Sequence, residues 1–456
     1  MKRFKAYDTH QSYLLPPSPQ EWLPGDHLAY FIDNVVDQLD LSEIFAGYEG
    51  TKGQPPYHPQ MMIGVWLYGY CVGIRSSRRL ERALYEDVGF RMLSGNQQPD
   101  HWTLSEFRRR HLGGLKGLFL QTVKLAQQAG LVKLGQVAID GTKLQASASK
   151  HRAMSYGRMV KEEQRLRDEI ARYFEEVETT DQAEDERYGA KRGDELPDHF
   201  KTEAQRLEAI REAMVRLEEE ARQKAKAEQE KRREKANKEG RGYRPRKDPS
   251  DAVPSPKAQH NFTDPDSRIM KNAGKAFIQG YNGQIAVDVD SQIIVAAELS
   301  NQAADGPHLV GMVEQVEAVT KERPGEVLAD AGYFSEDNVT TLQERGMAVL
   351  IPPERVRHRT WRERCSPSAP PPEDTSVAQW MSYRLTQPEN RERYRKRQQS
   401  VEPVFGQIKH ARGLRQFLLR GLDKVAAVWQ LDCAAHNLLK LYRSGLPLQP
   451  ASWSRP

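Results

Sequence analysis

The sequence predicts an α/β fold in which helices flank a mixed sheet. Two short apolar strands, at 136–140 and 326–330, each end on an aspartate, and a β-hairpin pattern lies between them at 278–299. Helical periodicity over 1–135 predicts an all-helical region before the sheet. A charged helical insertion over 156–257 is predicted to interrupt the sheet.

Composition and charge limit the kind of protein this can be. The chain has 456 residues, enough for two or three domains, and a net charge of +5. Clustered positive charge is what a polyanion-binding surface requires, because neutralised phosphates release counterions. The longest apolar run, Met61–Ile74, is too short to cross a bilayer, and the N-terminus lacks the apolar core of a signal peptide. We therefore expect a soluble cytoplasmic protein with no membrane association.

Cysteine usage argues against two stabilising devices. The three cysteines lie far apart and form no Cys-x-x-Cys pair: Cys71, Cys365 and Cys433. We therefore expect neither a disulfide framework nor a structural zinc site, which suits a reducing compartment.

The first 135 residues are predicted to form a helical domain that contacts DNA. Pro59 is placed to open a helix over the apolar run, and arginines cluster at two later helix ends. This pattern is compatible with a DNA-reading helical domain, although basic helix ends are common in any helical domain. The candidate DNA contacts are Arg78, Arg79 and Arg109.

The predicted strands present acids at their ends. The first apolar strand ends on Asp140 before Gly141, and the second ends on Asp330. An Asp-Gly pair after a strand is most often only a turn; the alternative is a carboxylate presented at the end of a buried strand. Other acids near the predicted sheet are assigned to a hairpin turn or a helix cap: Asp288, Asp290 and Asp305.

The insertion over 156–257 is predicted to be a charged helical hairpin followed by a linker. Its apolar residues recur three, four or seven apart, which is the spacing of a helical or coiled-coil seam. Residues 222–247 then contain twelve Lys/Arg against four Glu. That stretch either contacts DNA or is only a solvated charged helix. Further on, 352–390 is predicted to be a surface loop and 444–456 a disordered tail.

A late basic segment contains the third acid of interest. Residues 391–420 hold nine Lys/Arg and only two acids, one of which is Glu402. A lone carboxylate among cations suggests an acid kept for a divalent metal, with the cations placed for phosphate. The alternative is a solvated basic helix with an ordinary ion pair. Pro403 either begins a helix or kinks one; if it begins one, Glu402 and Lys409 are seven apart and share a face.

The order of the predicted elements is strand, hairpin, helix, strand, helix, strand, helix, which is the order of an RNase H-like fold. Parallel pairing of the strands that end on Asp140 and Asp330 would bring these acids side by side, and Glu402 would approach from a helix packed on the sheet. Three carboxylates without a Cys or His cluster select a hard cation such as Mg²⁺ or Mn²⁺. Two such ions could clamp the attacking and leaving oxygens of a phosphodiester.

These motifs resemble the DDE transposases of bacterial insertion sequences, in the group with a Tyr-Arg-Glu-Lys signature around the last acid. The signature residues here are Tyr394, Arg397, Glu402 and Lys409. The spacing from Arg397 to Glu402 is one residue longer than the strict pattern. Similar contexts surround the two aspartates and precede the hairpin: Ile139-Asp140-Gly141-Thr142-Lys143, Leu328-Ala329-Asp330-Ala331-Gly332-Tyr333 and Gly280-Tyr281-Asn282-Gly283-Gln284.

The resemblance implies an enzyme that cuts and joins DNA. Asp140, Asp330 and Glu402 would hold two Mg²⁺ or Mn²⁺ ions, so that a 3′-OH is freed at an element end and directed at target DNA. Arg397 and Lys409 would hold phosphate, and Tyr394 would contact the DNA backbone. The implied partners are double-stranded DNA and further copies of this chain assembled on it, at the nucleoid in the bacterial cytoplasm.

The predicted domains are a helical domain over 1–135, a catalytic domain over 136–155 and 258–443, the insertion over 156–257 and the tail. Two alternatives to a transposase remain open. An RNase H-like nuclease that only hydrolyses would use the same acids, and a non-catalytic basic DNA-binding protein could retain them. Strand-transfer products would exclude the first alternative, and nicking that EDTA abolishes would exclude the second.

Overall fold

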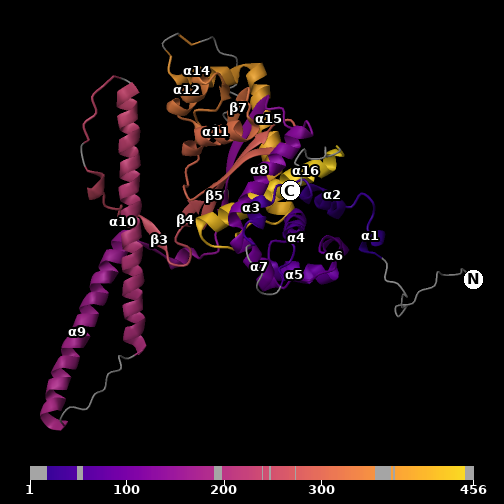
Figure 1. The fold of residues 1–456 in the computed structure, drawn as a ribbon. Helices are drawn as coiled ribbons and strands as arrows, with labels where there is room; N and C mark the ends of the chain where they lie inside the picture. The colour runs from indigo at the N-terminus through magenta and orange to yellow at the C-terminus, as the bar shows by residue number, and fades with distance from the viewer. Residues whose placement is uncertain are drawn as a thin grey trace, which may run out of the picture. The chain divides into compact units, whose positions relative to one another are not determined.

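A computed structural model describes residues 18–48, 55–188, 198–238, 240–245, 248–272, 274–354, 371–372 and 375–446 (Figure 1). Its contacts divide the chain into two compact units. The first unit combines residues 1–144 with 281–456, and the second is formed by 145–280. The predicted tail lies outside the described residues from residue 447 onward.

The N-terminal part of the first unit is helical, as predicted. Pro59 occupies the first turn of its central helix, where a missing N–H breaks no hydrogen bond. That helix is buried on all sides, and Trp66 and Tyr70 within it are fully buried. The helices are α1 (Pro19–Trp22), α2 (Leu28–Val36), α3 (Ser42–Phe45), α4 (Pro59–Cys71), α5 (Ser77–Glu86), α6 (Val88–Leu93), α7 (His101–Arg110) and α8 (Leu112–Gln128).

The sheet has the strand order of an RNase H-like fold. Its strands are β1 (Gln136–Gln145), β5 (Phe277–Asp288), β6 (Ile294–Ser300), β7 (Glu326–Ala329) and β8 (Ala348–Leu350). They lie in the order β6-β5-β1-β7-β8. β5 and β6 form the predicted antiparallel hairpin, whereas β1, β7 and β8 are parallel. The predicted mixed α/β sheet is confirmed.

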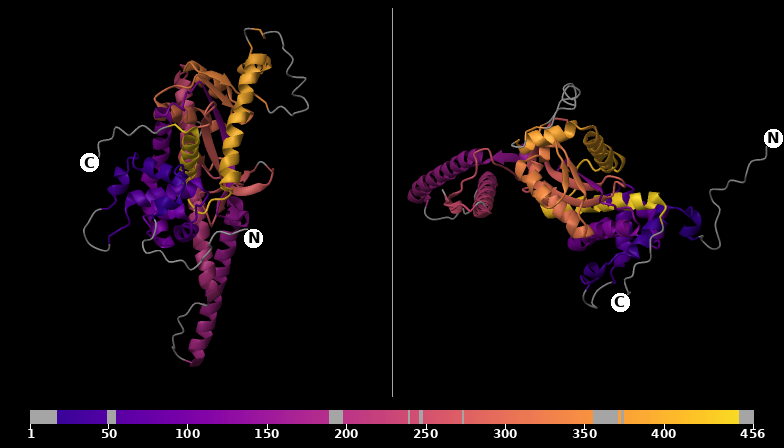
Figure 2. Two further views of the ribbon diagram at one scale, coloured as in Figure 1. Left: turned by 90° about the vertical axis from the view of Figure 1, so that its right-hand side faces the viewer. Right: turned by 90° about the horizontal axis from the view of Figure 1, so that it is seen from above.

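Helices lie on both sides of these strands (Figure 2). They are η3 (Gly306–His308), α11 (Leu309–Thr320), η4 (Ala331–Tyr333), α12 (Glu336–Glu344), α14 (Val377–Thr386), α15 (Pro388–Gly406), the π-helical turn η5 (Gln407–Ala411) and α16 (Leu422–Ser444). α16 packs on the hairpin. The Trp429 ring lies against Gly283, so close that a Cβ atom on Gly283 would be about 3.0 Å from the ring. The Asn437 amide there bonds the backbone N–H and C=O of Ile294. α16 also packs on α8 and α4, so the N-terminal helices and the sheet share one core.

The predicted surface loop over 352–390 is wrong in its last part. Residues 377–386 form α14, which buries Met381 and Leu385. Ser376 and Gln379 begin this helix with a reciprocal capping box. Few apolar residues are needed here because only one side of so short a helix is buried, and the sequence pattern was too sparse to reveal it.

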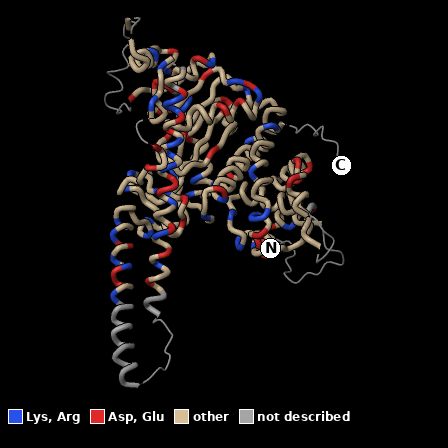
Figure 3. The backbone as a smooth tube through the Cα atoms, turned by 60° about the vertical axis from the view of Figure 1, so that its left-hand side comes forward, with Lys and Arg blue, Asp and Glu red and all other residues tan. Residues whose placement is uncertain are grey.

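The second unit contains the predicted helical hairpin, formed by α9 (Tyr156–Tyr188) and α10 (Asp198–Lys238). The part of the predicted seam whose burial is described packs together, with Met159 and Leu166 in one buried cluster with Ile210 and Leu217. Both basic and acidic positions are frequent along the described helices of this hairpin (Figure 3). The smaller elements are η1 (Lys150–Arg152), β2 (Ala153–Ser155), η2 (Pro249–Asp251), β3 (Gln259–Asn261) and β4 (Arg268–Lys271); β2 pairs with β3, and β4 with the beginning of β5. None of the helices in the described ranges has the length and apolar character needed to cross a membrane.

Candidate active site

Asp140 and Asp330 lie beside each other on neighbouring parallel strands. β1 and β7 pair so that Ile139 is opposite Ala329, and each aspartate is the next residue. The predicted strand end at Asp140 is wrong, because β1 continues through Asp140 to Gln145, whereas β7 ends at Ala329. The parallel register still places Asp330, just after β7, beside Asp140. The predicted pairing of these two strands is confirmed by their register.

The carboxylate of Asp140 is buried beside a second negative charge. Burial and, to a smaller extent, the charge of Asp330 raise its pKa to about 6, although Arg397 and the Gly141 N–H act in the opposite direction. Arg397 Nη1 donates to Asp140 Oδ2 at 2.9 Å, and the Gly141 N–H donates to Oδ1 at 2.8 Å. Two adjacent carboxylates, one of them buried, fit a divalent cation.

Asp330 is held by the backbone that follows it. Its Oδ1 accepts the Gly332 N–H at 2.8 Å and so caps the 3₁₀ turn η4. This bond fixes the direction in which the carboxylate leaves β7. The same turn places Tyr333 in the interior, where it is fully buried.

Three of the four signature residues lie beside these aspartates. Arg397 pairs with Asp140, and its guanidinium carbon lies 5.8 Å from the centre of the Tyr394 ring. Lys409 donates to Thr142 Oγ1 and, at 3.4 Å, to the Lys143 carbonyl. Burial lowers the pKa of Lys409, and the charge of Asp140 opposes this shift. In this arrangement Arg397 has a protein carboxylate, that of Asp140, as its partner.

Glu402 is placed differently from the other predicted ligands. Its side chain is exposed, and in the described part of the chain no group of three or more Asp, Glu, His or Cys side chains could hold a metal ion. Five residues separate it from Arg397, which is about 140° around an α-helix at 3.6 residues per turn. The structure thus brings two of the three predicted metal ligands together, and the role of Glu402 stays a prediction.

The assumption that a helix begins at Pro403 is wrong. α15 starts at Pro388, continues through Pro403 to Gly406 and then changes to the π-helical turn η5. The backbone N–H that proline lacks would have bonded the Gln399 carbonyl; Gln292 Nε2 bonds this carbonyl instead, at 3.2 Å. Because of the π-turn, Glu402 and Lys409 are not two regular turns apart, so the predicted shared face does not hold.

A buried polar network beside the aspartates was missed. Asp305 accepts hydrogen bonds from Lys143 Nζ at 2.8 Å, Asn282 Nδ2 at 2.8 Å and Gln284 Nε2 at 2.9 Å. Burial would raise its pKa, but these hydrogen bonds outweigh burial, and the pKa of Asp305 lies below its usual value. The side chain makes no cap bond, so the predicted helix-cap role of Asp305 is wrong.

This network packs directly against the residue after Asp140. A side chain at Gly141 would lie 2.7 Å from Asp305 Oδ1, which explains the glycine there. Tyr333 donates its hydroxyl to Gln284 Oε1, so η4 is joined to the same network. One sequence signal was present: Asn282 and Gln284 are polar residues inside an apolar strand, and both prove to be fully buried.

The N-terminal arginines fall into two groups. Arg75 is buried and makes a two-pronged ion pair with Asp432 on α16, one bond measuring 2.7 Å. It also donates to the Arg412 carbonyl at 2.6 Å. The three predicted DNA contacts are exposed: Arg78, Arg79 and Arg109. Arg109 already forms a bidentate pair with Glu106, at 2.7 and 2.8 Å.

Two family models match the chain. Residues 17–110 match a transposase domain (DUF772), and residues 250–438 match a transposase DDE domain. Together these ranges cover more than half of the sequence. A search of curated proteins and a search of solved structures each gave no match.

The fold and the domain matches define the class: an RNase H-like enzyme of the nuclease and transposase type. Within this class, the chain belongs to the DDE transposases of insertion sequences. Such enzymes act on DNA and generally use divalent metal ions. Asp330 and Glu402 lie inside the matched DDE range, whereas Asp140 lies between the two matched ranges.

Proposed function

We propose that this transposase cleaves the ends of its element and joins the freed 3′-OH to target DNA at the edge formed by Asp140 and Asp330. The observation that supports this most is the parallel register of β1 and β7, which presents two carboxylates together. Burial raises the pKa of Asp140, and the neighbouring charge of Asp330 adds to this effect, so a cation bound beside them would be stabilised. Mg²⁺ or Mn²⁺ held there would polarise the scissile phosphate and activate the attacking oxygen.

Each signature residue has a proposed role. Asp140 and Asp330 would hold the metal, with Glu402 as the third ligand. Glu402 can join them only if α15 turns, because it lies about 140° around the helix from Arg397. Arg397 would exchange Asp140 for a DNA phosphate in the same movement. Lys409 would hold a second phosphate beside β1, and Tyr394 would contact the DNA backbone, so that the chemistry rests on positioning and charge neutralisation.

The proposal predicts joined products that depend on both metal and aspartates. Purified protein, a DNA fragment with the element end and a supercoiled target plasmid should give strand-transfer products in Mg²⁺ and none in EDTA. Asp330→Asn should keep DNA binding and lose product by about 10²-fold or more, the scale seen when a transition-state stabiliser is removed. Glu336→Gln, which removes an exposed charge on α12, should keep wild-type yield.

Two outcomes would contradict this function. Product formation by Asp330→Asn at the wild-type rate would show that the chemistry is elsewhere. Cut ends without joined products, under conditions in which the 3′-OH is free, would instead identify a nuclease that only hydrolyses.

A further inference from the structure

The second helix of the hairpin, α10, changes its charge along its length. Residues 198–221 contain four Lys/Arg and seven Asp/Glu, whereas residues 222–238 contain eight Lys/Arg and three Glu. One continuous helix thus has an acidic first half and a basic second half. The two halves differ in their surroundings as well.

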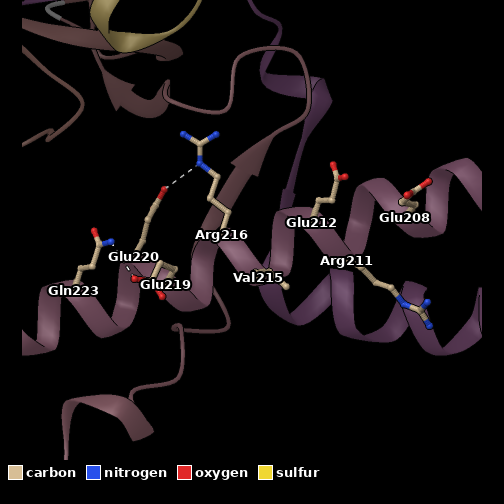
Figure 4. Close-up of a pocket in the computed structure, with 8 residues that line it drawn as sticks. All are labelled: Glu208, Arg211, Glu212, Val215, Arg216, Glu219, Glu220 and Gln223. Carbon is tan, nitrogen blue, oxygen red and sulfur yellow. Dashed lines mark hydrogen bonds and ion pairs between the residues drawn. The ribbon is translucent and has the colours of Figure 1, made fainter.

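The first half of α10 builds the hairpin, and its arginines are paired with acids. Arg206 pairs with Glu162 of α9 at 2.8 Å, and Arg211 pairs with Glu163 at 3.0 Å. The groove along this half is lined by four glutamates, at positions 208, 212, 219 and 220 (Figure 4). In it Arg216 pairs with Glu220 at 3.7 Å. This groove therefore repels a polyanion and needs no further partner for its cations.

The second half of α10 extends beyond the helix that packs on the first half. Tyr156, the first residue of α9, donates its hydroxyl to Glu218 at 2.7 Å, so α9 lies beside α10 only up to that level. Beyond that level, the segment that follows α10, including η2 (Pro249–Asp251), packs on the face of α10 that contains Ala225, Gln229 and Arg232. The faces of the basic half that point away from this segment are exposed.

Four cations of this basic half form two exposed rows. Lys224 and Lys231 are seven residues apart, as are Lys226 and Arg233, so each pair lies on one face, about 10 Å apart along the axis. All four side chains are exposed, and in the described part of the chain none of them has an ion-pair partner. Cations repeated at two-turn spacing suit a ligand with repeated negative charge.

We propose that this basic half of α10 binds the phosphate backbone of duplex DNA without reading its sequence. Lysine and arginine rows that neutralise phosphates supply affinity through counterion release. Duplex DNA is the polyanion on which a transposase acts. The surface thus assigns the insertion the role of a DNA anchor outside the aspartate site, and it requires neither metal binding nor strand chemistry.

The test compares three double variants of the full-length protein, each of which loses two positive charges from the same helix. Lys224→Gln/Lys231→Gln and Lys226→Gln/Arg233→Gln each remove one row. Arg206→Gln/Arg211→Gln is the control, because these arginines are already paired with acids. Glutamine has a helix propensity close to that of lysine and arginine, and circular dichroism with thermal unfolding checks that every variant is folded.

Affinity for a fluorescent duplex of arbitrary sequence is measured by anisotropy in EDTA over a KCl series. Each lost phosphate contact lowers the slope of log K against log salt by about 0.9, so a row variant should lose about 1 to 2 from that slope and bind several-fold more weakly. The control should change neither. If both row variants bind like the control, the proposal is wrong. Because EDTA prevents the chemistry, failed strand transfer would leave this measurement unaffected.

Discussion

Arg397 donates a hydrogen bond to Asp140 at 2.9 Å, although 257 residues separate the two in the sequence. The pair joins α15 to the middle of β1, beside Asp330. It places a guanidinium next to a carboxylate that burial and a neighbouring charge keep hard to ionise. This ion pair should therefore be the first contact of the site to change when metal or phosphate binds.

Removing Arg397 should destabilise the protein, because its guanidinium would no longer offset the charges of Asp140 and Asp330. Arg397→Gln should destabilise the protein in EDTA by about 3–5 kcal/mol, the range for breaking a buried pair on one side. Adding Asp140→Asn should restore much of this loss, because the buried charge then disappears. Urea denaturation measures both. Arg395→Gln, at an exposed position of the same helix, should change stability by less than about 0.5 kcal/mol; an equal loss there would contradict the argument.

Metal binding should depend on pH through Asp140. Folding raises its pKa from 3.8 to about 6, so the folded chain retains this proton between these values, and the group's contribution to stability falls as pH rises through that window. A metal must displace the proton. The rise in melting temperature caused by Mn²⁺ should thus be small at pH 5 and complete by about pH 7.5. An equal rise at both pH values, or one that survives Asp140→Asn, would disprove this link.

Neighbouring arginines of the N-terminal region should have separable effects. Arg75→Gln should destabilise the protein by about 3–5 kcal/mol, because Asp432 is then left charged and buried. Arg78→Gln, at an exposed site, should leave stability within about 0.5 kcal/mol but weaken DNA binding if the predicted contact exists. Denaturation and anisotropy distinguish the two variants. A stable Arg75→Gln protein would show that the ion pair contributes little.

Acid should destabilise the protein through His436. Burial, assisted by the charge of Arg412, lowers its pKa to about 3, and its Nε2 lies 2.8 Å from the Gln292 carbonyl. In the unfolded chain, His436 has a pKa near 6.5 and is protonated at pH values at which the folded chain keeps it neutral. Stability is then lost as pH falls below 6.5, by up to about 1.4 kcal/mol per pH unit. His436→Gln should flatten this loss in denaturation at several pH values, whereas His410→Gln, at an exposed histidine, should not.

The strands and their aspartates could be predicted because their signals are local. An apolar run that ends on an acid marks each strand, and the parallel RNase H-like order then determines that Asp140 and Asp330 meet. The helical seam of the insertion was visible for the same reason, since the spacing of residues such as Leu207 and Ile210 reports directly on the buried face.

The predictions that proved wrong concern residues whose partners are distant in the sequence. Asp305 looks like a helix cap locally, but Lys143 and Gln284 reach it from other strands. The helix phase at Glu402 depends on whether α15 can pass through Pro403, and it passes because Gln292, which lies 107 residues from Gln399, supplies the missing donor. No pattern within α15 contains this information.

The π-turn η5 makes the length of the chain between Gly406 and Arg412 a determinant of the site. The Arg412 N–H bonds the Gln407 carbonyl, five residues back, at 2.9 Å, so the turn contains one residue more than an α-helical turn. Deleting one residue between Gly406 and Lys409 would rotate Lys409 by about 100°. Its ammonium would then move away from Thr142, although Lys409 itself is unchanged. Insertions and deletions in this short segment should therefore be tolerated far less than substitutions at its exposed positions.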